Sequence, residues 1–369
     1  MIFLNSRSKP GFINQIAIYL HYLAIVGLLI SLIAAYVHPE KLWFISLIGI
    51  AFPVLYIINV LFLLFWLFNG RSHMFHSLIV LVLGFQTLNT YVHFGRNQSK
   101  VKTDEHSLKV VSFNVHNFSR LQSGVFDKSA QKECFQFLEN QQADIICLQE
   151  FSYAGSNIYA SNIQLKHRLG AETYYYESYY NPLKNKLFGL VTYSKFPIVN
   201  TGYFEEEGSR KFGIFTDLLI EEDTVRVYNI HLESTRLTEE EYSLLSQLDS
   251  TFKKRSVKVL RKMKRTMNIR AKQADMIADN MSQTDHEIIV CGDFNEAPNT
   301  YVYKKIKNDL TDSFELADKG LGKTFQSILP FFRIDYIFSS EKFEALKYEE
   351  FPINLSDHYP IKASFKYLP

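Results

Sequence analysis

Cysteine is scarce in this sequence, with 3 residues in a chain of 369. A small, odd number of cysteines in so long a chain indicates no disulfide framework. Cys147 and Cys291 lie in strongly apolar runs, so we expect them to be small buried hydrophobic side chains. Neither sign of charge is in excess, because 40 Lys and Arg stand against 38 Asp and Glu, and this balance argues neither for nor against an anionic partner. Phosphate-binding glycine loops, CxxC pairs and dinucleotide-binding fingerprints are also absent from the sequence.

Charged side chains are absent from three stretches of the first hundred residues: 13–37, 42–68 and 74–94. Each stretch reaches the roughly 20 residues that a helix needs to cross the hydrocarbon core of a membrane. Helices of soluble domains alternate apolar with charged residues, and these stretches do not. The first stretch is also too long for a signal peptide, and two more follow it. The sequence therefore predicts three transmembrane helices.

Other features of these stretches bear on their place in a membrane. Pro53 lies inside the second stretch, and spanning helices tolerate proline. Aromatic residues that favour the membrane interface lie near the ends of the stretches: Tyr36, Trp43, Trp66 and Tyr91. Three spans would place the two chain ends on opposite sides, and Lys and Arg occur on both sides, so the positive-inside rule gives no decisive bias. The basic N-terminus favours a cytoplasmic start, which predicts an integral protein of the cell membrane with an extracytoplasmic C-terminal domain.

The chain divides into parts of different composition. Residues 1–96 form the predicted membrane anchor, and residues 97–107 are polar without periodicity, which is typical of a linker. Residues 108–369 contain the short apolar runs of an α/β protein, and about 260 residues make one domain of ordinary size. The sequence contains no internal repeat.

Several apolar runs of the C-terminal part end in polar residues, and their content of Val, Ile and aromatic residues predicts buried strands. One of them, IIVCGDFN, ends with Asp293 and Asn295. Side chains at positions i and i+2 of a strand point the same way, so these two would converge on one pocket, with Phe294 directed into the core. Taken singly, each of these polar residues is more simply explained as a turn former or a structural histidine. Polar residues at the ends of several strands are explained together if they line one shared pocket. The other polar strand ends are Asn114, Glu150, His231, Asp335, Asp357 and His358.

These residue types suit one kind of chemistry. Carboxylates and carboxamides offer hard oxygen ligands, which suit Mg²⁺ or Mn²⁺ better than Zn²⁺. The NH₂ group of a carboxamide can also donate a hydrogen bond to a phosphate oxygen. Histidines, here His231 and His358, can transfer protons near neutral pH.

Seven motifs follow one another along the C-terminal part: SFNV, LQE, GLVTYSKFPI, NIHLES, CGDFNEAP, RIDYIF and SDHYPI. In these motifs the chain resembles the endonuclease/exonuclease/phosphatase family, which has the fold of DNase I. The resemblance covers residues 108–368 and leaves the N-terminal stretches outside. It implies a four-layer αββα sandwich, in which two β-sheets pack face to face between outer helices and the active site lies at one end of the sheets. It also implies Mg²⁺-dependent hydrolysis of a phosphate ester.

The resemblance implies a metal site made of three motif residues. Glu150, from the LQE motif, would be the principal ligand of the metal. Asn114 would help to hold the metal or a phosphate oxygen, and Asp357 would be a further ligand. One-metal and two-metal mechanisms both fit these residues.

Five other motif residues would act on the water and the phosphate. Asp293 and Asn295 would orient the attacking water and bind the scissile phosphate. Asp335 would fix the tautomer of His358 and favour its charged form, and His231 would be the second histidine at the phosphate. Phosphoryl transfer requires charge neutralisation and an in-line nucleophile, which either Asp293 or a metal-bound hydroxide would supply.

Three features bear on the substrate, which the family resemblance leaves open. Residues 253–272 are densely basic and would either bind nucleic acid or acidic lipid, or form the solvated face of a packed helix. Residues 173–182, TYYYESYYNP, would either stack on bases or lipid, or form a strand on a half-buried sheet. The membrane anchor would restrict the enzyme to substrates that reach the membrane surface.

We therefore predict a nuclease-like phosphodiesterase, with hydrolysis of phospholipids or inositol phosphates as the alternative. A catalytically silent phosphate-binding module is a second class of function, and the full set of acid, amide and histidine groups argues against it. The predicted partners are the phosphate-ester substrate and the lipid bilayer, and no feature of the sequence indicates a protein partner.

Overall fold

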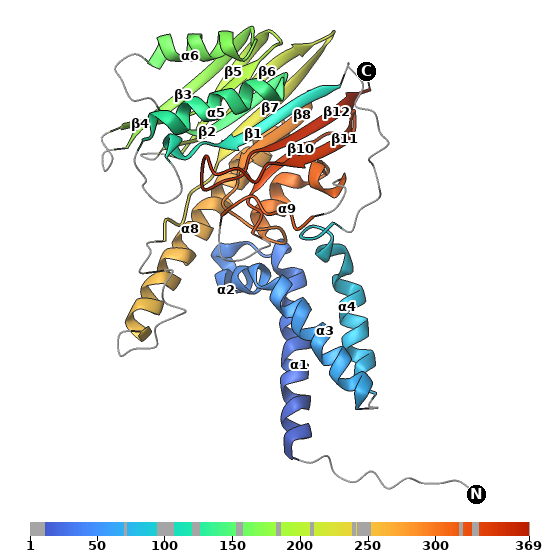
Figure 1. Cartoon of the computed structure of the whole chain (residues 1–369). Helices are drawn as coiled ribbons and strands as arrows, with labels where there is room; N and C mark the ends of the chain where they lie inside the picture. Colours follow the sequence, from blue (N-terminus) through green and yellow to red (C-terminus); the bar gives the residue numbers. More distant parts are fainter. Residues whose placement is uncertain are drawn as a thin grey trace, which may run out of the picture.

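The structure is a computed structural model of the chain. It describes residues 12–69, 72–93, 107–119, 126–152, 158–181, 186–206, 210–237, 241, 252–316, 320–326 and 332–368. Most of the predicted linker, residues 97–106, lies outside these ranges. An N-terminal helix bundle, at the bottom of Figure 1, adjoins a larger α/β sandwich at the top.

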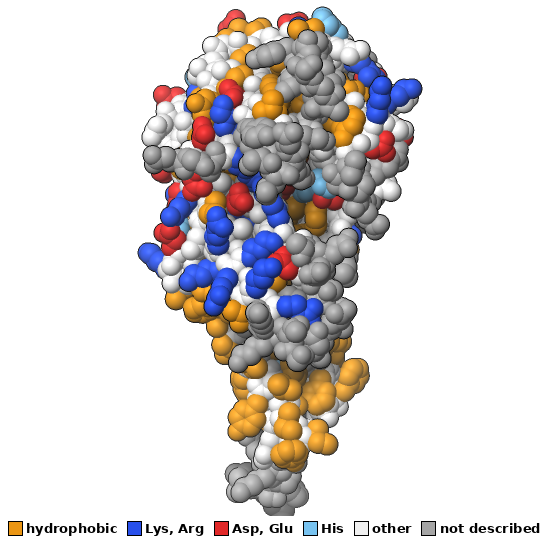
Figure 2. Space-filling view, turned by 90° about the vertical axis from the view of Figure 1, so that its left-hand side faces the viewer, with side chains coloured by type: hydrophobic (Ala, Val, Ile, Leu, Met, Phe, Trp, Pro, Cys, Tyr) orange, Lys and Arg blue, Asp and Glu red, His pale blue; other side chains and the backbone are white. Residues whose placement is uncertain are grey.

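The described part of the N-terminal bundle contains α1 (Phe12–Ile33), α2 (Pro39–Ile50), α3 (Phe52–Phe68) and α4 (Met74–Leu88). A 3-10 turn, η1 (Ala34–Tyr36), extends α1. Helices α1, α3 and α4 pack together around Leu28, Phe52 and Val80. Their outward side chains are apolar (Figure 2), and Leu23 and Val82 are 68% and 65% exposed. An exposed apolar surface of this kind is typical of contact with a membrane or a partner.

The prediction of three spanning helices is not supported. Among the described residues, one helix, Phe12–Tyr36 with 25 residues, is long and apolar enough to cross a membrane. Helices α2 and α3 meet at a bend of 52°, so the stretch 42–68 supplies at most one broken span. Helix α4 has 15 residues, and crossing requires roughly 20.

The helix ends explain this difference. Leu42 has non-helical angles, φ −144° and ψ 69°, and Ala51 ends α2 with ψ 0°. Pro53 then occupies the first turn of α3, where its missing N–H group costs no hydrogen bond. The proline therefore begins a helix instead of lying inside a span, and an uncharged run carries no signal for such a break.

The sandwich contains two sheets of six strands each. The first sheet has the order β11–β12–β1–β2–β4–β3, with β1 (Leu108–Asn114), β2 (Ile145–Ser152), β3 (Thr173–Asn181), β4 (Lys186–Ser194), β11 (Phe343–Glu350) and β12 (Ile361–Tyr367). The second sheet has the order β5–β6–β7–β8–β10–β9, with β5 (Ile198–Glu205), β6 (Lys211–Ile220), β7 (Asp223–His231), β8 (Glu287–Asp293), β9 (Thr311–Asp312) and β10 (Asp335–Ser339). One pair of neighbours in each sheet is parallel, β1–β2 and β7–β8, so both sheets are mixed.

Helices cover the outer face of each sheet (Figure 1). The first sheet carries α5 (Lys128–Gln141) and α6 (Ile158–Arg168), and the second carries α8 (Phe252–Met281) and α9 (Tyr301–Lys307). Short 3-10 turns follow β1 and β9, namely η2 (His116–Phe118) and η4 (Ser313–Leu316). Apolar side chains of both sheets meet between them, and they include Cys147 and Cys291, which are buried as the sequence predicts. The four-layer α/β sandwich is thereby confirmed.

The bundle is hydrogen-bonded to the segment that follows β8. Tyr91 donates from its hydroxyl group to the carbonyl of Pro298, and Asn299 donates from its amide to the carbonyl of Ser31 at 2.9 Å. Arg333, just before β10, donates to a carbonyl adjacent to Tyr91 at 2.8 Å. The bundle and the sandwich are therefore joined beside the end of β8.

Candidate active site

Strand alternation directs polar side chains into the space between the sheets at one end of the sandwich. On β8, Cys291 faces the opposite sheet and Val290 faces the outer helices. Because side chains alternate along a strand, Asp293 continues the inward row at the end of β8. The same rule extends the inward rows of three other strands to polar residues, Asn114 on β1, His231 on β7 and Asp335 on β10.

Asp293 is the centre of this cluster and is 1% exposed. Its carboxylate accepts hydrogen bonds from the side chain of Asn114 at 3.0 Å, from the backbone of Asn295 at 2.8 Å and from the Asn295 side chain at 3.1 Å. Asn295 reaches Asp293 through a turn, with φ 52°, and not by continuation of the strand. Phe294, between them, is buried in the core under the outer helices. The structure thus brings Asp293 and Asn295 together by a tighter route than the sequence predicts.

Gly292 allows β7 and β8 to approach closely just before Asp293. Its φ is 143°, and a Cβ atom there would lie 2.0 Å from the carbonyl oxygen of Ile230. Any other residue at this position would clash with β7, so the glycine of the CGDFN motif is required by the backbone.

His358 and Asp335 form a buried pair next to Asp293. The Nδ1 atom of His358 lies 2.9 Å and 3.1 Å from the two carboxylate oxygens of Asp335, and its Nε2 atom lies 3.6 Å from Oδ2 of Asp293. Burial alone would lower the pKa of His358, but the charges of Asp335 and Asp293 raise it well above its usual value. The imidazole is therefore held as a cation, with one nitrogen bonded to Asp335 and the other near Asp293.

His231 is a second buried histidine beside Asp293. Its Nε2 atom lies 3.6 Å from Oδ2 of Asp293 and 3.5 Å from Oε1 of Glu150. Within the described residues this nitrogen has no hydrogen-bond partner. Burial lowers the pKa of His231 well below its usual value, and the positive charges around it lower it further. His231 is therefore neutral near pH 7, and its Nε2 atom is available to a ligand.

A bulge in β2 brings Glu150 to the site. Simple alternation after Cys147 would direct Glu150 toward the outer helices. The pairing of β2 with β4 shifts between Leu148 and Phe151, and Glu150 adopts φ 50°. Bulges re-aim side chains in this way, which explains how the carboxylate of Glu150 reaches His231.

Burial also changes the acid–base behaviour of Asp293. It raises the pKa of Asp293 to about 7, although the charge of His358 lowers that value and the charge of Asp335 raises it. A carboxyl group with this pKa can accept and release a proton near neutral pH.

Asp357 lies slightly apart from this cluster. Its carboxylate is 3.3 Å from Nδ1 of His116 and accepts a hydrogen bond from Ser356 at 3.2 Å. The backbone of His116 in turn donates to the amide oxygen of Asn114 at 3.0 Å. Asp357 is therefore connected to Asp293 through His116 and Asn114 among the described contacts.

The donor set fits a hard divalent cation. Asp293, Asp335 and His358 offer ligand atoms that all lie within 4.8 Å of one another. Asp335 and His358 are already bonded to each other, whereas the side chains of Glu150 and Asp357 are 21% and 24% exposed. Carboxylate oxygens with access for water molecules are the ligands that Mg²⁺ prefers.

Sequence reasoning missed two residues that support the site. Arg270, on α8, lies 2.8 Å from Glu296, and both side chains are 3% exposed. Arg270 also donates to the carbonyl of Glu233 at 2.9 Å, so it ties together the segments that follow His231 and Asn295. Its signal in the sequence was weak, because Arg270 lies within a basic segment whose other described Lys and Arg residues are mostly exposed.

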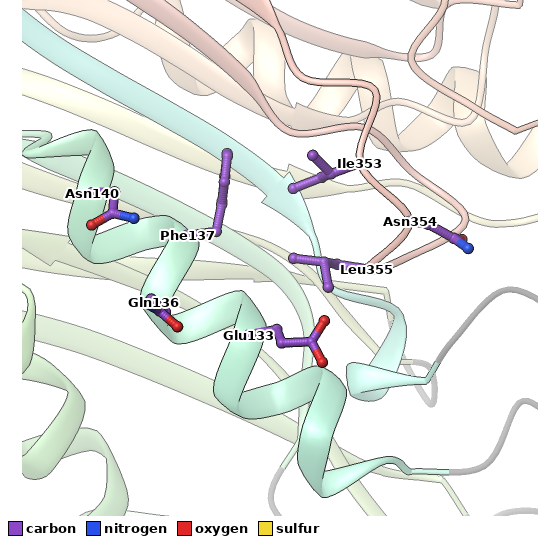
Figure 3. A pocket seen from close by; sticks show the side chains of 7 residues that line it. All are labelled: Glu133, Gln136, Phe137, Asn140, Ile353, Asn354 and Leu355. Carbon is purple, nitrogen blue, oxygen red and sulfur yellow. The ribbon is translucent and has the colours of Figure 1, made fainter.

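An open groove lies elsewhere on the sandwich, between α5 and the loop before β12 (Figure 3). It is lined by Glu133, Gln136, Phe137, Asn140, Ile353, Asn354 and Leu355. None of these is a predicted site residue, and the lining contains a single carboxylate and no histidine. The groove therefore lacks the groups for phosphate-ester chemistry.

Comparison with known proteins separates the two parts of the chain. Residues 111–358 match the model of the Endonuclease/Exonuclease/phosphatase family, and residues 14–91 match a domain of unknown function (DUF8431). No curated protein matches the chain.

Several solved structures resemble the sandwich at low sequence identity. A family protein from Leptotrichia buccalis C-1013-b is 16% identical with a TM-score of 0.47, over 70% of this chain and 100% of that chain. A mannosyl-6-phosphatase from Bacteroides thetaiotaomicron VPI-5482 is 18% identical with a TM-score of 0.47, over 71% and 100%. The catalytic domain of human Nocturnin, solved with a bound sulfate anion, is 17% identical with a TM-score of 0.46, over 71% and 94%.

Proposed function

Because the chain belongs to the endonuclease/exonuclease/phosphatase family, we propose that it is a divalent-metal-dependent hydrolase of phosphate esters, held at a membrane by its N-terminal helices. The observation that carries this proposal is the position of Asp293 at one end of the sandwich. Its carboxylate is bonded to two asparagines and lies 3.6 Å from the Nε2 atoms of His231 and His358.

Each of these groups has a task in phosphoryl transfer, which requires positioning and charge neutralisation. Asp293, with its pKa of about 7, would hold the attacking water and accept its proton. His358, kept cationic by Asp335, would stabilise negative charge that develops on a phosphoryl oxygen. His231, which is neutral, would form a hydrogen bond to the phosphate through its Nε2 atom, which has no partner within the described residues. Asn295, whose amide group donates to Asp293 and to the carbonyl of Leu232, would hold Asp293 in place for the attacking water.

Glu150 and Asp357 would hold the divalent cation, as carboxylates that water can reach. When bound, Mg²⁺ would neutralise charge on the phosphate as a Lewis acid. Asn114 was predicted to help hold the metal or a phosphate oxygen, and its amide group donates to Asp293 and accepts from the backbone of His116. Through the first of these bonds Asn114 would also orient Asp293.

The family leaves the substrate open, and we propose a nuclease-like phosphodiesterase. A second candidate is a phosphate ester of a lipid headgroup or an inositol. The hydrogen bonds of Tyr91 and Ser31 to the segment after Asn295 favour this second candidate, because they place the apolar bundle next to the site. Residues 1–96 would form the anchor and residues 108–369 the catalytic domain, on the extracytoplasmic side of the cell membrane.

The first test is metal-dependent hydrolysis by the full chain in detergent or lipid nanodiscs. The substrates are single- and double-stranded DNA, RNA, phospholipids and inositol phosphates, each with Mg²⁺ and with EDTA. We expect Mg²⁺-dependent cleavage of one class, and a loss of about 10²- to 10⁴-fold in Asp293→Asn and His358→Gln.

A matched control is His167→Gln, which changes an exposed histidine on α6 and should keep full activity. Full activity in EDTA would contradict the metal dependence. Full activity in both site variants would contradict the assignment of the site.

A further inference from the structure

Helix α8 has two halves with different environments. Its second half packs on the second sheet, and Met267, Ala271, Ala274 and Ile277 are at most 1% exposed. Its first half leaves the sheet and runs toward the level of the helix bundle, at the lower left of Figure 1. The side chains of Val257 and Leu260 are 39% and 40% exposed, so the described residues cover the apolar side chains of this half only in part.

The first half of α8 carries an exposed basic face. It consists of Lys258, Arg261, Lys264 and Arg265, which are spaced so that they lie on one side of the helix. The sequence contains no Asp or Glu between residues 252 and 274. Among the described residues, Arg261 and Arg265 have no carboxylate partner within 4.0 Å. Lys258 lies 3.7 Å from Glu241, so within the described part of the chain the unpaired charge of this face is that of Arg261, Lys264 and Arg265.

This basic face lies at the boundary between the apolar bundle and the polar sandwich. Helix α2 packs along α8, where Lys264 lies 5.9 Å from the ring centre of Trp43 and Lys272 lies 2.8 Å from Glu40. Lys304 lies 5.9 Å from the ring centre of Tyr36 at the end of the long apolar helix. Figure 2 shows the Lys and Arg side chains as a band directly above the exposed apolar side chains of the bundle.

Such a band has the composition of a membrane interface. Tryptophan and tyrosine favour the depth of the lipid headgroups, and exposed Lys and Arg beside exposed apolar residues bind anionic lipid surfaces. We propose that the basic face of α8 binds the anionic phospholipid headgroups of the membrane that holds the bundle. This inference rests on the membrane attachment in the proposed function and adds the lipid charge that the protein recognises.

The same helix connects the lipid surface to the active site. Arg270, one turn beyond the basic face, bonds to the carbonyl of Glu233 and to Glu296 on the segments that follow His231 and Asn295. Binding of α8 to headgroups therefore holds the rim of the site at the membrane surface.

Tryptophan fluorescence of the full chain in lipid vesicles tests the proposal. The chain has 2 tryptophans, so the wild type and both variants carry Trp66→Phe, and Trp43 beside Lys264 is the reporter. Equal mole fractions of acyl-brominated phosphatidylglycerol or brominated phosphatidylcholine are included in otherwise identical vesicles. We expect phosphatidylglycerol to quench about twofold more, and high salt to remove the excess.

The decisive variant is Arg261→Glu, Lys264→Glu, Arg265→Glu in one chain, which should lose the excess quenching by phosphatidylglycerol. The matched control is Lys128→Glu, Lys132→Glu, Lys366→Glu, which makes the same change of charge on exposed positions of α5 and β12 and should keep it. Hydrolysis of a soluble phosphate ester by both variants checks that they are folded.

Quenching and hydrolysis together distinguish failure of this inference from failure of the proposed hydrolase activity. Equal quenching by the two lipids in the wild-type chain, or unchanged selectivity in the α8 variant, overturns the inference while hydrolysis can persist. Selectivity that persists in a chain without hydrolysis supports the inference and contradicts the proposed function. Absence of quenching by either lipid overturns both the membrane attachment and the inference. Loss of single-stranded DNA binding in the α8 variant, with lipid selectivity intact, assigns the face to nucleic acid instead.

Discussion

Gly292 is the residue on which the geometry of the site depends most directly. It precedes Asp293, and its φ of 143° and the nearby carbonyl of Ile230 leave no room for a Cβ atom. We predict that Gly292→Ala loses more than about 4 kcal/mol of unfolding free energy, or fails to fold, because either β7 or β8 must move. Chemical denaturation in detergent, followed by circular dichroism, measures this loss.

Gly170 provides the control for this substitution. It also has a positive φ, 64°, but no atom lies within 4 Å of a Cβ built there. Gly170→Ala should therefore cost only the roughly 1–2 kcal/mol of a left-handed backbone. Equal losses in the two variants would show that the contact with Ile230 is unimportant.

The individual residues of the site could be predicted from the sequence more readily than any other feature of the molecule. Asp293 and His231 end strands and Asp335 begins one, and the apolar alternation of these strands is visible in the sequence, so the inward direction of the three side chains follows from spacing. Glu150 also ends a predicted strand, but alternation alone would direct it to the outer helices, because the bulge in β2 is not visible in the sequence. Arg270 could not be found, because burial by tertiary packing distinguishes it from the exposed basic residues around it, and no local pattern does.

At the scale of elements, the pair of strands β6 and β7 contains a buried ion pair away from the site. Asp217 and Arg226 face each other across these strands, with contacts of 2.7 Å and 2.8 Å, and the Asp217 side chain is 2% exposed. Burial alone would raise the pKa of Asp217, but hydrogen bonds from Arg226 and Asn200 lower it below its usual value.

This pair predicts how stability depends on pH. A carboxylate whose folded pKa is lowered stabilises the fold at pH values above its unfolded pKa of about 3.9, and this stabilisation is lost as the pH falls through the folded pKa. Asp217→Asn should cost about 3 kcal/mol at pH 6, since it leaves Arg226 buried without a counter-charge. The difference from wild type should shrink below about pH 4.

Urea denaturation of the full chain in a nonionic detergent between pH 3 and pH 6 checks this prediction. Asp285→Asn, at an exposed position near the end of α8, is the control and should change little at any pH in this range. A constant difference between wild type and Asp217→Asn over the whole range would exclude titration of Asp217 as the cause.

The N-terminal helices show where sequence reasoning about elements fails. Three uncharged stretches predicted three spans, because hydropathy records composition and not backbone angles. The break at Ala51 before Pro53 turns one stretch into two helices, one of which lies against α8. Contacts of α2 with α8, such as the ion pair of Glu40 with Lys272, stabilise this arrangement only in the folded protein.

At the scale of the whole molecule, the order of strands in the sheets could not be predicted from the sequence. Strands β1 and β12 pair although more than two hundred residues separate them, and no local pattern encodes this pairing. The four layers followed from the family resemblance and not from periodicity. The contact of the bundle with the segment 296–299 was also unpredicted, because it depends on single hydrogen bonds between distant parts.

This contact predicts coupling between the bundle and the catalytic domain. Tyr91 is 1% exposed, so Tyr91→Phe leaves the carbonyl of Pro298 buried without its donor. We expect a loss of about 1–3 kcal/mol in unfolding free energy, because a buried acceptor is left without a hydrogen bond. We also expect a several-fold lower turnover, because the segment after Asn295 loses the hydrogen bond that holds it to the bundle. Tyr203→Phe, at a 50% exposed position on β5, is the control and should leave both quantities unchanged. Turnover equal to wild type in Tyr91→Phe would show that the junction serves stability alone.

The short junction at Pro298 and Asn299 also sets the distance over which the enzyme can work. A catalytic domain on a long tether samples a wide volume, whereas a domain hydrogen-bonded to its own bundle would stay at one height above a bilayer that holds the bundle, as we propose. Once attached, such an enzyme meets esters within the bilayer by diffusion in two dimensions. Its rate on those esters would then follow their surface density, while esters in bulk solution would have to come to it.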